Sequence, residues 1–417
     1  MSDLKTIAQM SKNASFTTAI LDIDTKNAAL EAVAQALLEN KDRIFEANQK
    51  DLVRSEGEGL EGPLMKRLRF DDHKLNDVVD GIRSLIKLDD PVGTLKLHTT
   101  LDDGLELYRV TCPIGVIGVI FESRPDALVQ IATLCLKSGN AVFLKGGREA
   151  AETNRVLFEV IRDASVQKGL PEGWINLLES REEVNAMLGL SDYIDLIIPR
   201  GSNAFVQYIM QNTTIPVMGH ADGVCHTYID RYADEAKALK VAVDAKTQYV
   251  SVCNATETIL IDQTLKDTLM PKLIAALEEK GVKVHLESEV TEWHHEYLDY
   301  EVSIKLTNSI DEAIDHINKY GSGHTDAIIT EKTDRAEYFM NKVDSGSVLL
   351  NCSTRFADGF RYGFGAEVGI STSKLHARGP VGLEGLVSYK YKLYGDGHIV
   401  GDYASGNKKF KHIRRDI

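Results

Sequence analysis

The stretch from Lys246 to Asn254 carries the residues best suited to covalent chemistry. Its cysteine, Cys253, lies on the connector between a predicted helix over 235–245 and a predicted strand over 256–261. A scaffold holds such connectors in place while leaving them open to ligands, and a thiol there is a candidate nucleophile. Most cysteines are small buried hydrophobes, so this stretch alone leaves a structural Cys253 open as the alternative.

A second cysteine, Cys225, stands next to His226 at the start of another predicted strand. Adjacent residues of a strand point to opposite faces of the sheet, so these two side chains do not form a thiol–imidazole pair with each other. We therefore interpret Cys225 as structural.

A glycine pair flanked by cations follows the predicted strand over 141–144. Gly146 and Gly147 let the backbone approach a ligand closely, and Lys145 and Arg148 stand on either side. Ligands of open α/β sheets bind at the carboxyl ends of strands. A ribose 2′-phosphate would find its countercharge here, which favours NADP over NAD. The alternative is a polar turn with solvated cations, and no GxGxxG fingerprint supports the nucleotide reading.

The run Arg200-Gly201-Ser202-Asn203 follows the predicted strand over 194–198 and opens a helix. Ser202 or Asn203 would cap that helix, and its free N–H groups would also suit a phosphate. A simple helix cap remains the alternative.

Residues 351–380 are dense in glycine and polar side chains. Arg355 and Arg378 lie in this segment and can bind carboxylate or phosphate in a bidentate manner. A solvated loop is the alternative, although long irregular segments inside compact domains are usually functional.

The predicted elements that position these residues fall into two α/β blocks. Residues 3–90 show helical periodicity, and two alternating runs around Asp102-Asp103-Gly104 predict a hairpin over about 95–112. The hairpin is either an arm that pairs with another subunit or an ordinary edge hairpin. From residue 113 strands alternate with helices, and a second block begins near 226, so we expect largely parallel sheets covered on both faces. Residues 387–394 predict an edge strand beside the hairpin, and 408–415 a solvated basic tail.

Composition and charge narrow the possible functions. The chain has 417 residues and a formal net charge of -14, which argues against a nucleic-acid or anionic-membrane partner. Its five cysteines show no paired spacing, which fits a reducing compartment. We see no signal pattern, no apolar run of membrane-spanning length and no metal-ligand spacing. These features predict a cytoplasmic protein with no metal.

At this point the chain resembles the gamma-glutamyl phosphate reductases, a branch of the aldehyde dehydrogenase superfamily. The resemblance covers nearly the whole chain, and its motifs are specific as a set. They are PIGVIGVIFESRP over 113–125, LKSGNAVFLKGGRE over 136–149, IIPRG over 197–201, AKTQYVSVCN over 245–254, FGAEV over 364–368 and LHARGP over 375–380.

The resemblance implies an α/β fold of the aldehyde dehydrogenase type, with two Rossmann-like three-layer α/β/α domains and a β-hairpin oligomerisation arm. We expect an NADPH-binding domain over 1–225 interrupted by the arm, a catalytic domain over 226–386, and an oligomerisation strand with its tail over 387–417. A homo-oligomer, dimer or tetramer, follows from the arm.

The implied reaction is the NADPH-dependent reduction of L-glutamyl 5-phosphate to L-glutamate 5-semialdehyde, with release of phosphate, in L-proline biosynthesis. It places the nucleophile at Cys253, the adenosine ribose and its phosphate at Lys145, and the nicotinamide ribose at Glu296. We expect Arg124, Arg355 or Arg378 to steady the departing phosphate. A glutamate kinase is a candidate partner.

Two departures from generic aldehyde dehydrogenases bear on the mechanism. Those enzymes carry a glutamate that activates water in the segment matching 216–223, and this chain has none there. An acyl-phosphate reductase does not need that water, because phosphate leaves when Cys253 attacks. The generic oxyanion-binding Asn is replaced at Ser123, which leaves the Cys253 N–H and Asn254 as candidate donors.

Two other functions stay open on the sequence. One is an oxidative, phosphate-independent NAD(P) aldehyde dehydrogenase, which the missing glutamate disfavours. The other is a noncatalytic nucleotide-binding protein on the same scaffold, which the retained Cys253 and Lys145 disfavour.

Overall fold

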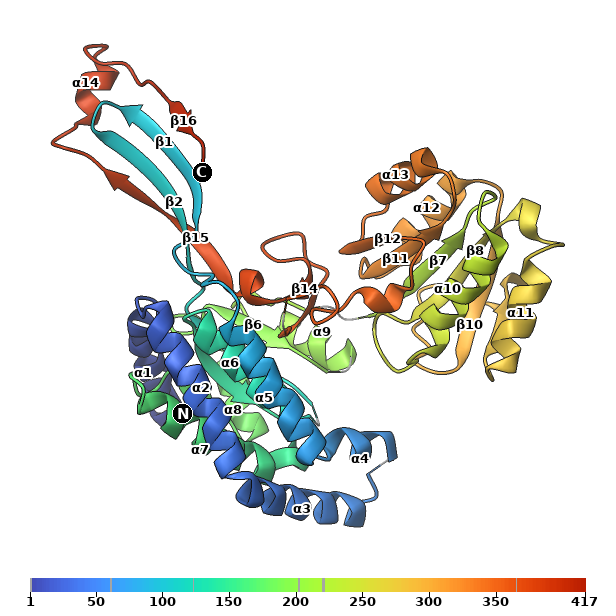
Figure 1. The fold of residues 1–417 in the computed structure, drawn as a ribbon, viewed down its shortest axis with the longest axis horizontal. Helices are drawn as coiled ribbons and strands as arrows, with labels where there is room; N and C mark the ends of the chain where they lie inside the picture. The colour runs from blue at the N-terminus through green and yellow to red at the C-terminus, as the bar shows by residue number, and fades with distance from the viewer. Residues whose placement is uncertain (1, 61, 123, 202, 220–221, 365) are drawn as a thin grey trace.

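The computed structural model describes residues 2–60, 62–122, 124–201, 203–219, 222–364 and 366–417. Figure 1 shows two α/β bodies and a long β arm that projects away from both. We call the bodies the N-terminal domain, which holds the sheet of residues 116–199, and the Cys253 domain, which holds the sheet of residues 225–350.

The N-terminal domain is built on a parallel sheet in the order β5-β4-β3-β6. Its strands are β3 (Val116–Ile120), β4 (Ala141–Lys145), β5 (Ile175–Leu177) and β6 (Leu196–Pro199). Each lies within two residues of its predicted position. The strands are apolar along most of their length because helices cover both faces.

Two apolar cores confirm the predicted three-layer packing of this domain. One core joins the sheet to α2 (Ile23–Glu39), α5 (Asp72–Ile86), α6 (Pro125–Lys137) and α7 (Ala151–Val166). The other joins the opposite face to α1 (Ser2–Thr18), α8 (Arg181–Met187) and α9 (Asn203–Gln211). Two further helices, α3 (Lys41–Gly57) and α4 (Gly62–Leu68), extend the first layer.

The Cys253 domain has a second parallel sheet, in the order β12-β11-β7-β8-β10-β9. Its strands are β7 (Cys225–Ile229), β8 (Thr256–Asp262), β9 (Lys283–Leu286), β10 (Glu301–Thr307), β11 (Thr325–Ile329) and β12 (Ser347–Leu350). One face packs on α10 (Glu235–Thr247) and α11 (Met270–Glu279), the other on α12 (Ile310–Tyr320) and α13 (Thr333–Lys342). The predicted fold class is therefore confirmed.

The arm is an antiparallel sheet in the order β15-β2-β1-β16. The predicted hairpin forms from β1 (Leu95–Asp102) and β2 (Leu105–Pro113), joined at Gly104 with a left-handed φ of 73°. The predicted edge strand, β15 (Val387–Tyr394), pairs with β2 along its whole length. The tail differs from its prediction: after α14 (Val400–Ala404), β16 (Ile413–Arg415) pairs with β1, because the edge of β1 offers unpaired backbone groups.

Residues 366–386 fall inside the predicted catalytic domain over 226–386, but they pack on the N-terminal domain. Val368, Val381 and Leu386 are buried in the core that holds α2, α5 and α6 of the N-terminal domain. This segment carries β13 (Gly369–Ser371), β14 (Gly379–Val381) and a 3-10 turn (Leu383–Leu386). The chain thus returns from the Cys253 domain to the N-terminal domain before it enters the arm (Figure 1).

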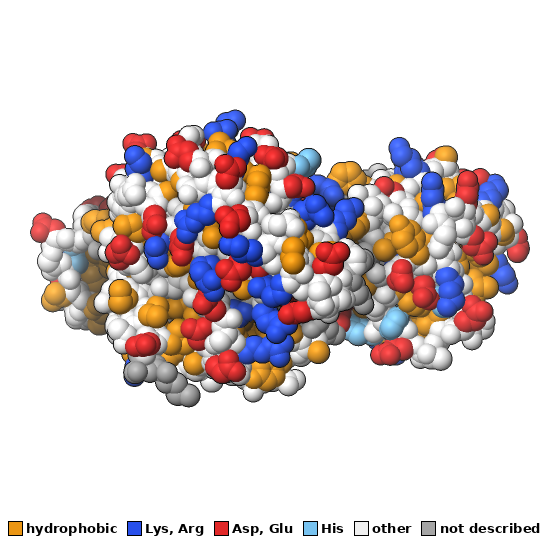
Figure 2. Space-filling view, turned by 90° about the horizontal axis from the view of Figure 1, so that it is seen from below, with side chains coloured by type: hydrophobic (Ala, Val, Ile, Leu, Met, Phe, Trp, Pro, Cys, Tyr) orange, Lys and Arg blue, Asp and Glu red, His pale blue; other side chains and the backbone are white. Residues whose placement is uncertain are grey.

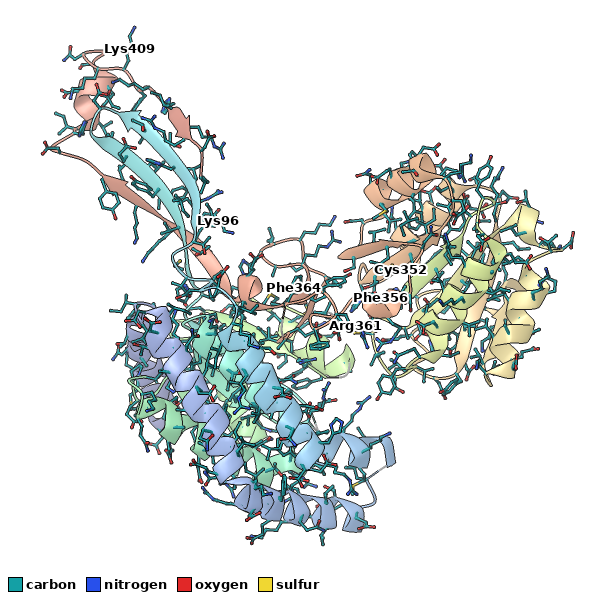
Figure 3. All side chains as sticks on the ribbon, in the orientation of Figure 1. Lys96, Cys352, Phe356, Arg361, Phe364 and Lys409 are labelled. Atoms are coloured by element: carbon teal, nitrogen blue, oxygen red, sulfur yellow. The ribbon has the colours of Figure 1, made fainter. Side chains whose placement is uncertain are left out.

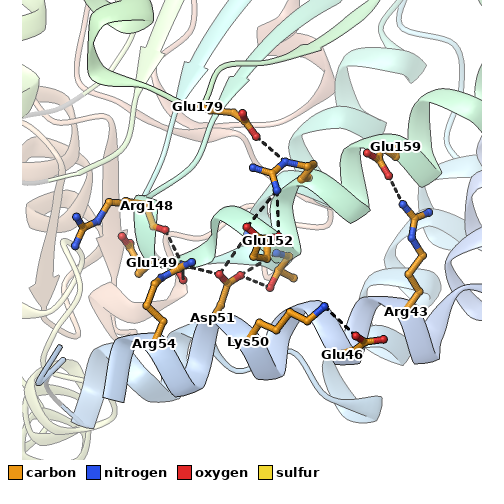
Figure 4. Close-up of polar contacts among 12 residues, drawn as sticks. Arg43, Glu46, Lys50, Asp51, Arg54, Arg148, Glu149, Glu152, Glu159 and Glu179 are labelled. Carbon is orange, nitrogen blue, oxygen red and sulfur yellow. Dashed lines mark hydrogen bonds and ion pairs between the residues drawn. The ribbon is translucent and has the colours of Figure 1, made fainter. Parts of the chain in front are cut away.

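A buried carboxylate, Asp51 of α3, fixes the start of α7 (Figure 4). Its side chain is fully buried and accepts hydrogen bonds from Thr153 N at 2.8 Å, Thr153 Oγ1 at 2.7 Å and Glu152 N at 3.2 Å. Arg54 supplies the countercharge at 2.5 Å. These donors are the free N–H groups of a helix start, where a negative charge is favourable.

We expect Asp51→Ala to lower the free energy of unfolding by about 2–4 kcal/mol, because it leaves buried donors and the Arg54 charge without an acceptor. Urea unfolding followed by circular dichroism measures this change. The matched control is Glu46→Ala on the same helix, whose pair with Lys50 is exposed to solvent, so its loss should leave the free energy of unfolding nearly unchanged. Equal effects of the two substitutions would contradict the assignment.

Candidate active site

Cys253 lies on the turn between α10 and β8, and its thiol side chain is half-buried. Two contacts fix its backbone. The thiol of Cys225 donates to the Cys253 carbonyl at 3.1 Å, and Gly223 packs so closely that a Cβ there would lie 2.3 Å from the Cys253 Cα. The predicted nucleophile is therefore held on a rigid connector that remains open on one side.

Cys225 and the adjacent His226 do not contact each other through their side chains and have different surroundings. Cys225 is fully buried, and burial raises the pKa of its thiol well above the usual range, so it is a poor nucleophile. Its thiol contacts the Cys253 backbone, whereas the adjacent His226 contacts Asp326, with 3.0 Å between Nδ1 and Oδ1. This placement agrees with a structural role for Cys225.

Asn254 is buried, and its side-chain Nδ2 donates to the Ala357 carbonyl at 2.9 Å. This bond ties the cysteine turn to the segment after β12 and uses one of the two N–H groups of the amide. Among the described residues, the Cys253 N–H donates no hydrogen bond. Both predicted oxyanion donors therefore stay open: the backbone N–H of Cys253 and the second N–H of the Asn254 amide.

Two arginines, Arg355 and Arg200, interact electrostatically with Cys253, and a third, Arg124, interacts with Arg200. Arg355 is buried, its Nε donates to Gln248 Oε1 at 3.0 Å, and burial lowers its pKa while the charge of Cys253 opposes that shift. Arg200, just after β6, has its pKa lowered by burial, opposed by Glu367 and Cys253. Arg124 lies close enough to Arg200 to interact with it, and pairs with Asp126 at 3.0 Å.

Arg378, the remaining predicted substrate ligand, has a different environment. Its guanidinium donates to the Asp344 carboxylate at 3.0 Å and to the Asp344 carbonyl at 2.9 Å. It also lines a cavity of about 930 Å³ at the base of the arm, together with Lys96, Arg109 and His376. The structure thus gives Arg378 a link between the 374–378 loop and the Cys253 domain.

The stretch of chain over 356–364 runs between the two domains. Figure 3 shows Phe356, Arg361 and Phe364 on this crossing segment. Arg361 Nη1 donates to the Arg355 carbonyl at 2.8 Å, which supports the backbone of the 3-10 turn Thr354–Phe356.

The carboxyl end of β4 carries the glycine pair and the two cations that were predicted to bind a nucleotide. A Cβ on Gly146 would lie 2.1 Å from Asn154 Nδ2, and one on Gly147 would lie 2.0 Å from a Glu149 oxygen, so a larger residue at either position would have to displace the end of a neighbouring side chain. Lys145 is half-buried, and burial lowers the pKa of its ammonium group. Arg148 is exposed and pairs with Glu58 at 2.6 Å.

A cavity of about 340 Å³ adjoins this turn, and it is lined by Ser55, Glu58, Gly59, Leu60, Leu64, Arg148 and Glu149. Its carboxylates and hydroxyl suit ribose hydroxyls, and its cation suits a phosphate. Figure 2 shows Lys and Arg side chains gathering toward the middle of the face seen from below. The cavity lining therefore offers acceptors for ribose hydroxyls and one cation, Arg148, which would have to exchange its pair with Glu58 for a phosphate.

The other predicted cofactor residues are placed as follows. Gly201 follows β6, and a Cβ there would lie 2.8 Å from a carboxylate oxygen of Glu122. Ser202 lies outside the described residues. Glu296 is half-buried, and its charge interacts with Lys246 and Glu257, which flank the cysteine turn.

Comparisons with known proteins identify the family. The aldehyde dehydrogenase family model matches residues 2–292 and 302–386. Gamma-glutamyl phosphate reductase of Acetivibrio thermocellus is 60% identical over 412 residues, covering 96% of each chain, and that of Ruminiclostridium cellulolyticum is 60% identical over 99% of this chain and 98% of its own. This chain is a member of the gamma-glutamyl phosphate reductase branch of the aldehyde dehydrogenase family.

The same branch appears among solved structures. The crystal structure of gamma-glutamyl phosphate reductase from Thermotoga maritima superposes with a TM-score of 0.92 at 36% identity, covering 95% of this chain and 99% of that one. The family resemblance and the fold that it implied are thereby confirmed.

This aldehyde dehydrogenase family member shows no group of three or more His, Cys, Asp or Glu suited to a metal ion within its described residues. Over the same residues, no helix is long and apolar enough to cross a membrane.

Sequence reasoning missed three residues of this site. Arg200 was considered only as part of a helix start, and its proximity to Cys253 depends on the packing of the two domains. Gly223 gave no signal at all. Glu257 did carry a sequence signal, because a carboxylate in a strand predicted to be buried requires a charged partner. Lys246, in the preceding helix, is that partner, with its Nζ 2.7 Å from Glu257.

The nucleotide site leads to a prediction for Lys145. We expect Lys145→Met to raise the dissociation constant of NADPH by about 10–100-fold, because one charge-assisted hydrogen bond is lost, and to change that of NADH by less than about threefold. Titration of nucleotide fluorescence measures both. Lys168→Met, at an exposed position, is the control. An equal loss for NADPH and NADH would place Lys145 away from the 2′-phosphate.

Proposed function

We propose that this protein reduces L-glutamyl 5-phosphate to L-glutamate 5-semialdehyde with NADPH and releases phosphate, a step of L-proline biosynthesis. The observation that carries the proposal is the half-buried Cys253 thiol with Arg200 and Arg355 around it. A nucleophile among cations suits a substrate that bears a phosphate leaving group. The names of the relatives at 60% identity support the same reaction.

The residues act in sequence on the acyl carbon. The Cys253 sulfur attacks it, and the developing oxyanion lies within reach of the Cys253 N–H. The C–O bond to phosphate then breaks, leaving a thioester on Cys253. Arg355 and Arg200 stabilise the departing dianion, and Arg124 adds positive charge from the N-terminal domain.

The cofactor residues bind and orient NADPH at the junction of the two domains. Lys145 and Arg148 hold the phosphate-bearing ribose, Gly146 and Gly147 admit the backbone contact, and Glu296 holds the nicotinamide ribose. NADPH, when bound, supplies the hydride that releases the aldehyde from Cys253. No glutamate stands in 216–223, so the chain lacks the residue that activates water in generic aldehyde dehydrogenases to hydrolyse the thioester.

The arm supports a homo-oligomer formed through β15. This strand has one row of exposed apolar side chains, Tyr389, Tyr391 and Leu393, each more than half exposed. Such a row along an edge strand suits pairing with a second copy of the chain. The oligomer is a dimer or tetramer, works in the cytoplasm, and receives its acyl phosphate from a glutamate kinase.

A phosphate-dependence assay in the reverse direction tests the function. Glutamate semialdehyde and NADP are supplied, phosphate is varied, and NADPH absorbance is followed. We expect NADPH to form only when phosphate is present, because phosphate must resolve the thioester. NADPH formation that is equal without phosphate would identify an ordinary aldehyde dehydrogenase.

A further inference from the structure

A buried ion pair brackets the cysteine turn. Lys246, in the last turn of α10, places its Nζ 2.7 Å from Glu257 Oε2, at the start of β8, and neither side chain has any solvent exposure. Burial lowers the pKa of Lys246 and raises that of Glu257 to about 7, while their mutual attraction opposes both shifts. A buried charge without a partner is strongly destabilising, so each of these side chains requires the other.

The pair has a second contact, with a strained residue. Glu257 Oε1 accepts the backbone N–H of Leu298 at 3.4 Å. Leu298 has a φ of 53°, in the left-handed region that residues with a Cβ disfavour. The residue is 44% exposed, so burial does not hold it in that conformation.

A further hydrogen bond holds the carbonyl group of Leu298. Ser251, two residues before Cys253, donates its Oγ to the Leu298 carbonyl at 3.2 Å. Both polar groups of the Leu298 backbone are therefore held by residues that flank Cys253. Strained backbone persists where its surroundings over-determine it, and such residues cluster at functional sites.

The strained residue lies next to the expected nicotinamide-ribose ligand. Glu296 is two positions before Leu298, and its charge interacts with both members of the buried pair. Tyr297, between them, has its ring 6.0 Å from Lys246 Nζ. The pair thus touches the segment 296–298 and both elements that carry the cysteine turn.

We propose that Glu257, whose buried charge Lys246 compensates, is a positioning residue that fixes the strained Leu298 backbone and thereby holds the 296–298 segment, which includes the expected nicotinamide-ribose ligand Glu296, in register with Cys253. The inference rests on the proposed function and assigns a role to residues that touch neither substrate nor cofactor. A hydride transfer depends on the distance between the bound nicotinamide and the thioester carbon, so a segment that wanders by about 1 Å is costly.

Two double variants separate this role from simple packing. Lys246→Met/Glu257→Met removes both charges together and also removes the acceptor for Leu298 N–H. Lys246→Met/Glu257→Gln removes both charges but keeps an amide oxygen for that N–H. Replacing both members of a buried pair leaves no unpaired charge, so both variants are expected to fold. Circular dichroism and thermal unfolding check this.

Amide hydrogen exchange of the peptide that spans 291–300 is the first readout, because it needs no cofactor and no activity. We expect the Met/Met variant to exchange at least tenfold faster at Leu298, to bind NADPH at least tenfold more weakly and to lose kcat. The Met/Gln variant should stay within about threefold of the parent in all three. If both double variants match the parent, or both fail equally, the proposal is wrong.

Ser251→Ala provides a second route should either double variant fail to fold. It removes the bond to the Leu298 carbonyl without touching the buried pair, and it should accelerate exchange at 291–300 and raise the NADPH dissociation constant about threefold. Unchanged exchange and unchanged binding in Ser251→Ala would overturn the proposal. Failure of the proposed function would look different, since the parent protein itself would then not bind NADPH or not require phosphate.

Discussion

Cys253→Ala is expected to reduce turnover by about 10⁴-fold or more, because the thioester forms only on this sulfur. The reaction is followed as NADPH formation from glutamate semialdehyde, NADP and phosphate. The half-buried thiol lies on a fixed turn beside Arg355, so its removal deletes the nucleophile while the contacts of Asn254 and Ala357 remain. The residual rate then reports what orientation and charge supply without the covalent step.

Cys112→Ala is the matched control for this substitution. Cys112 is a free, half-buried cysteine on β2 of the arm, and its replacement should leave turnover within about twofold. Iodoacetamide labelling followed by mass spectrometry gives an independent check, with the adduct expected at Cys253 and not at the fully buried Cys225. More than a tenth of the parent activity in Cys253→Ala would remove Cys253 from its role.

Local patterns were sufficient to predict the strands of both sheets. Apolar runs such as 116–121 and 256–261 match β3 and β8 because strands buried on both faces are continuously apolar. The hairpin was predicted from the Asp-Gly turn at residue 104, where the left-handed φ suits glycine. These features depend on residues close together in sequence, so a sequence contains them directly.

Packing between distant segments was not predictable in the same way. Val368, Val381 and Leu386 are apolar whichever core they join, and their assignment to the N-terminal domain depends on the path of the chain between domains. The pairing of β16 with β1 likewise depends on an open strand edge more than 300 positions away, as in His98 with Arg415. Neither feature has a local signature.

The site shows the same division. Cys253, Lys145 and the glycine pair were predicted because connector position and residue type suffice to propose their chemistry. The position of Arg200 beside Cys253 was not, because a β6 terminus and a β8 turn meet only when both domains are assembled. Arg378 was proposed as a substrate ligand from its type and segment and stays a prediction, while its bond to Asp344 depends on tertiary packing that the sequence did not reveal.

The glycine at position 223 gives the second large expected effect. A Cβ built there would lie 2.3 Å from both the Cys253 Cα and its carbonyl oxygen, and 2.6 Å from the carbonyl carbon. These are backbone atoms, so no side-chain rotation relieves the clash. Either the Cys253 turn or the strand entry at Gly223 has to move by about an ångström.

We therefore expect Gly223→Ala to lower kcat by at least about 100-fold, since a displacement of this size at a nucleophile has that consequence. Thermal unfolding should show a loss of about 1–3 kcal/mol, typical of overpacking, so that the protein still folds and activity can be measured. In Gly223→Ala the Cys253 thiol should also be displaced from its accessible position, so iodoacetamide should label Cys253 more slowly than in the parent.

Gly81→Ala is the matched control, because a Cβ there meets nothing within 4 Å and the residue lies inside α5. Alanine at such a position stabilises a helix by about 0.5–1 kcal/mol and should leave kcat unchanged. If Gly223→Ala keeps full activity and normal labelling of Cys253, the turn tolerates movement. The rigid placement of the nucleophile would then not be what this glycine secures, and the contact with the Cys225 thiol, at 3.1 Å from the Cys253 carbonyl, would be the remaining support to test.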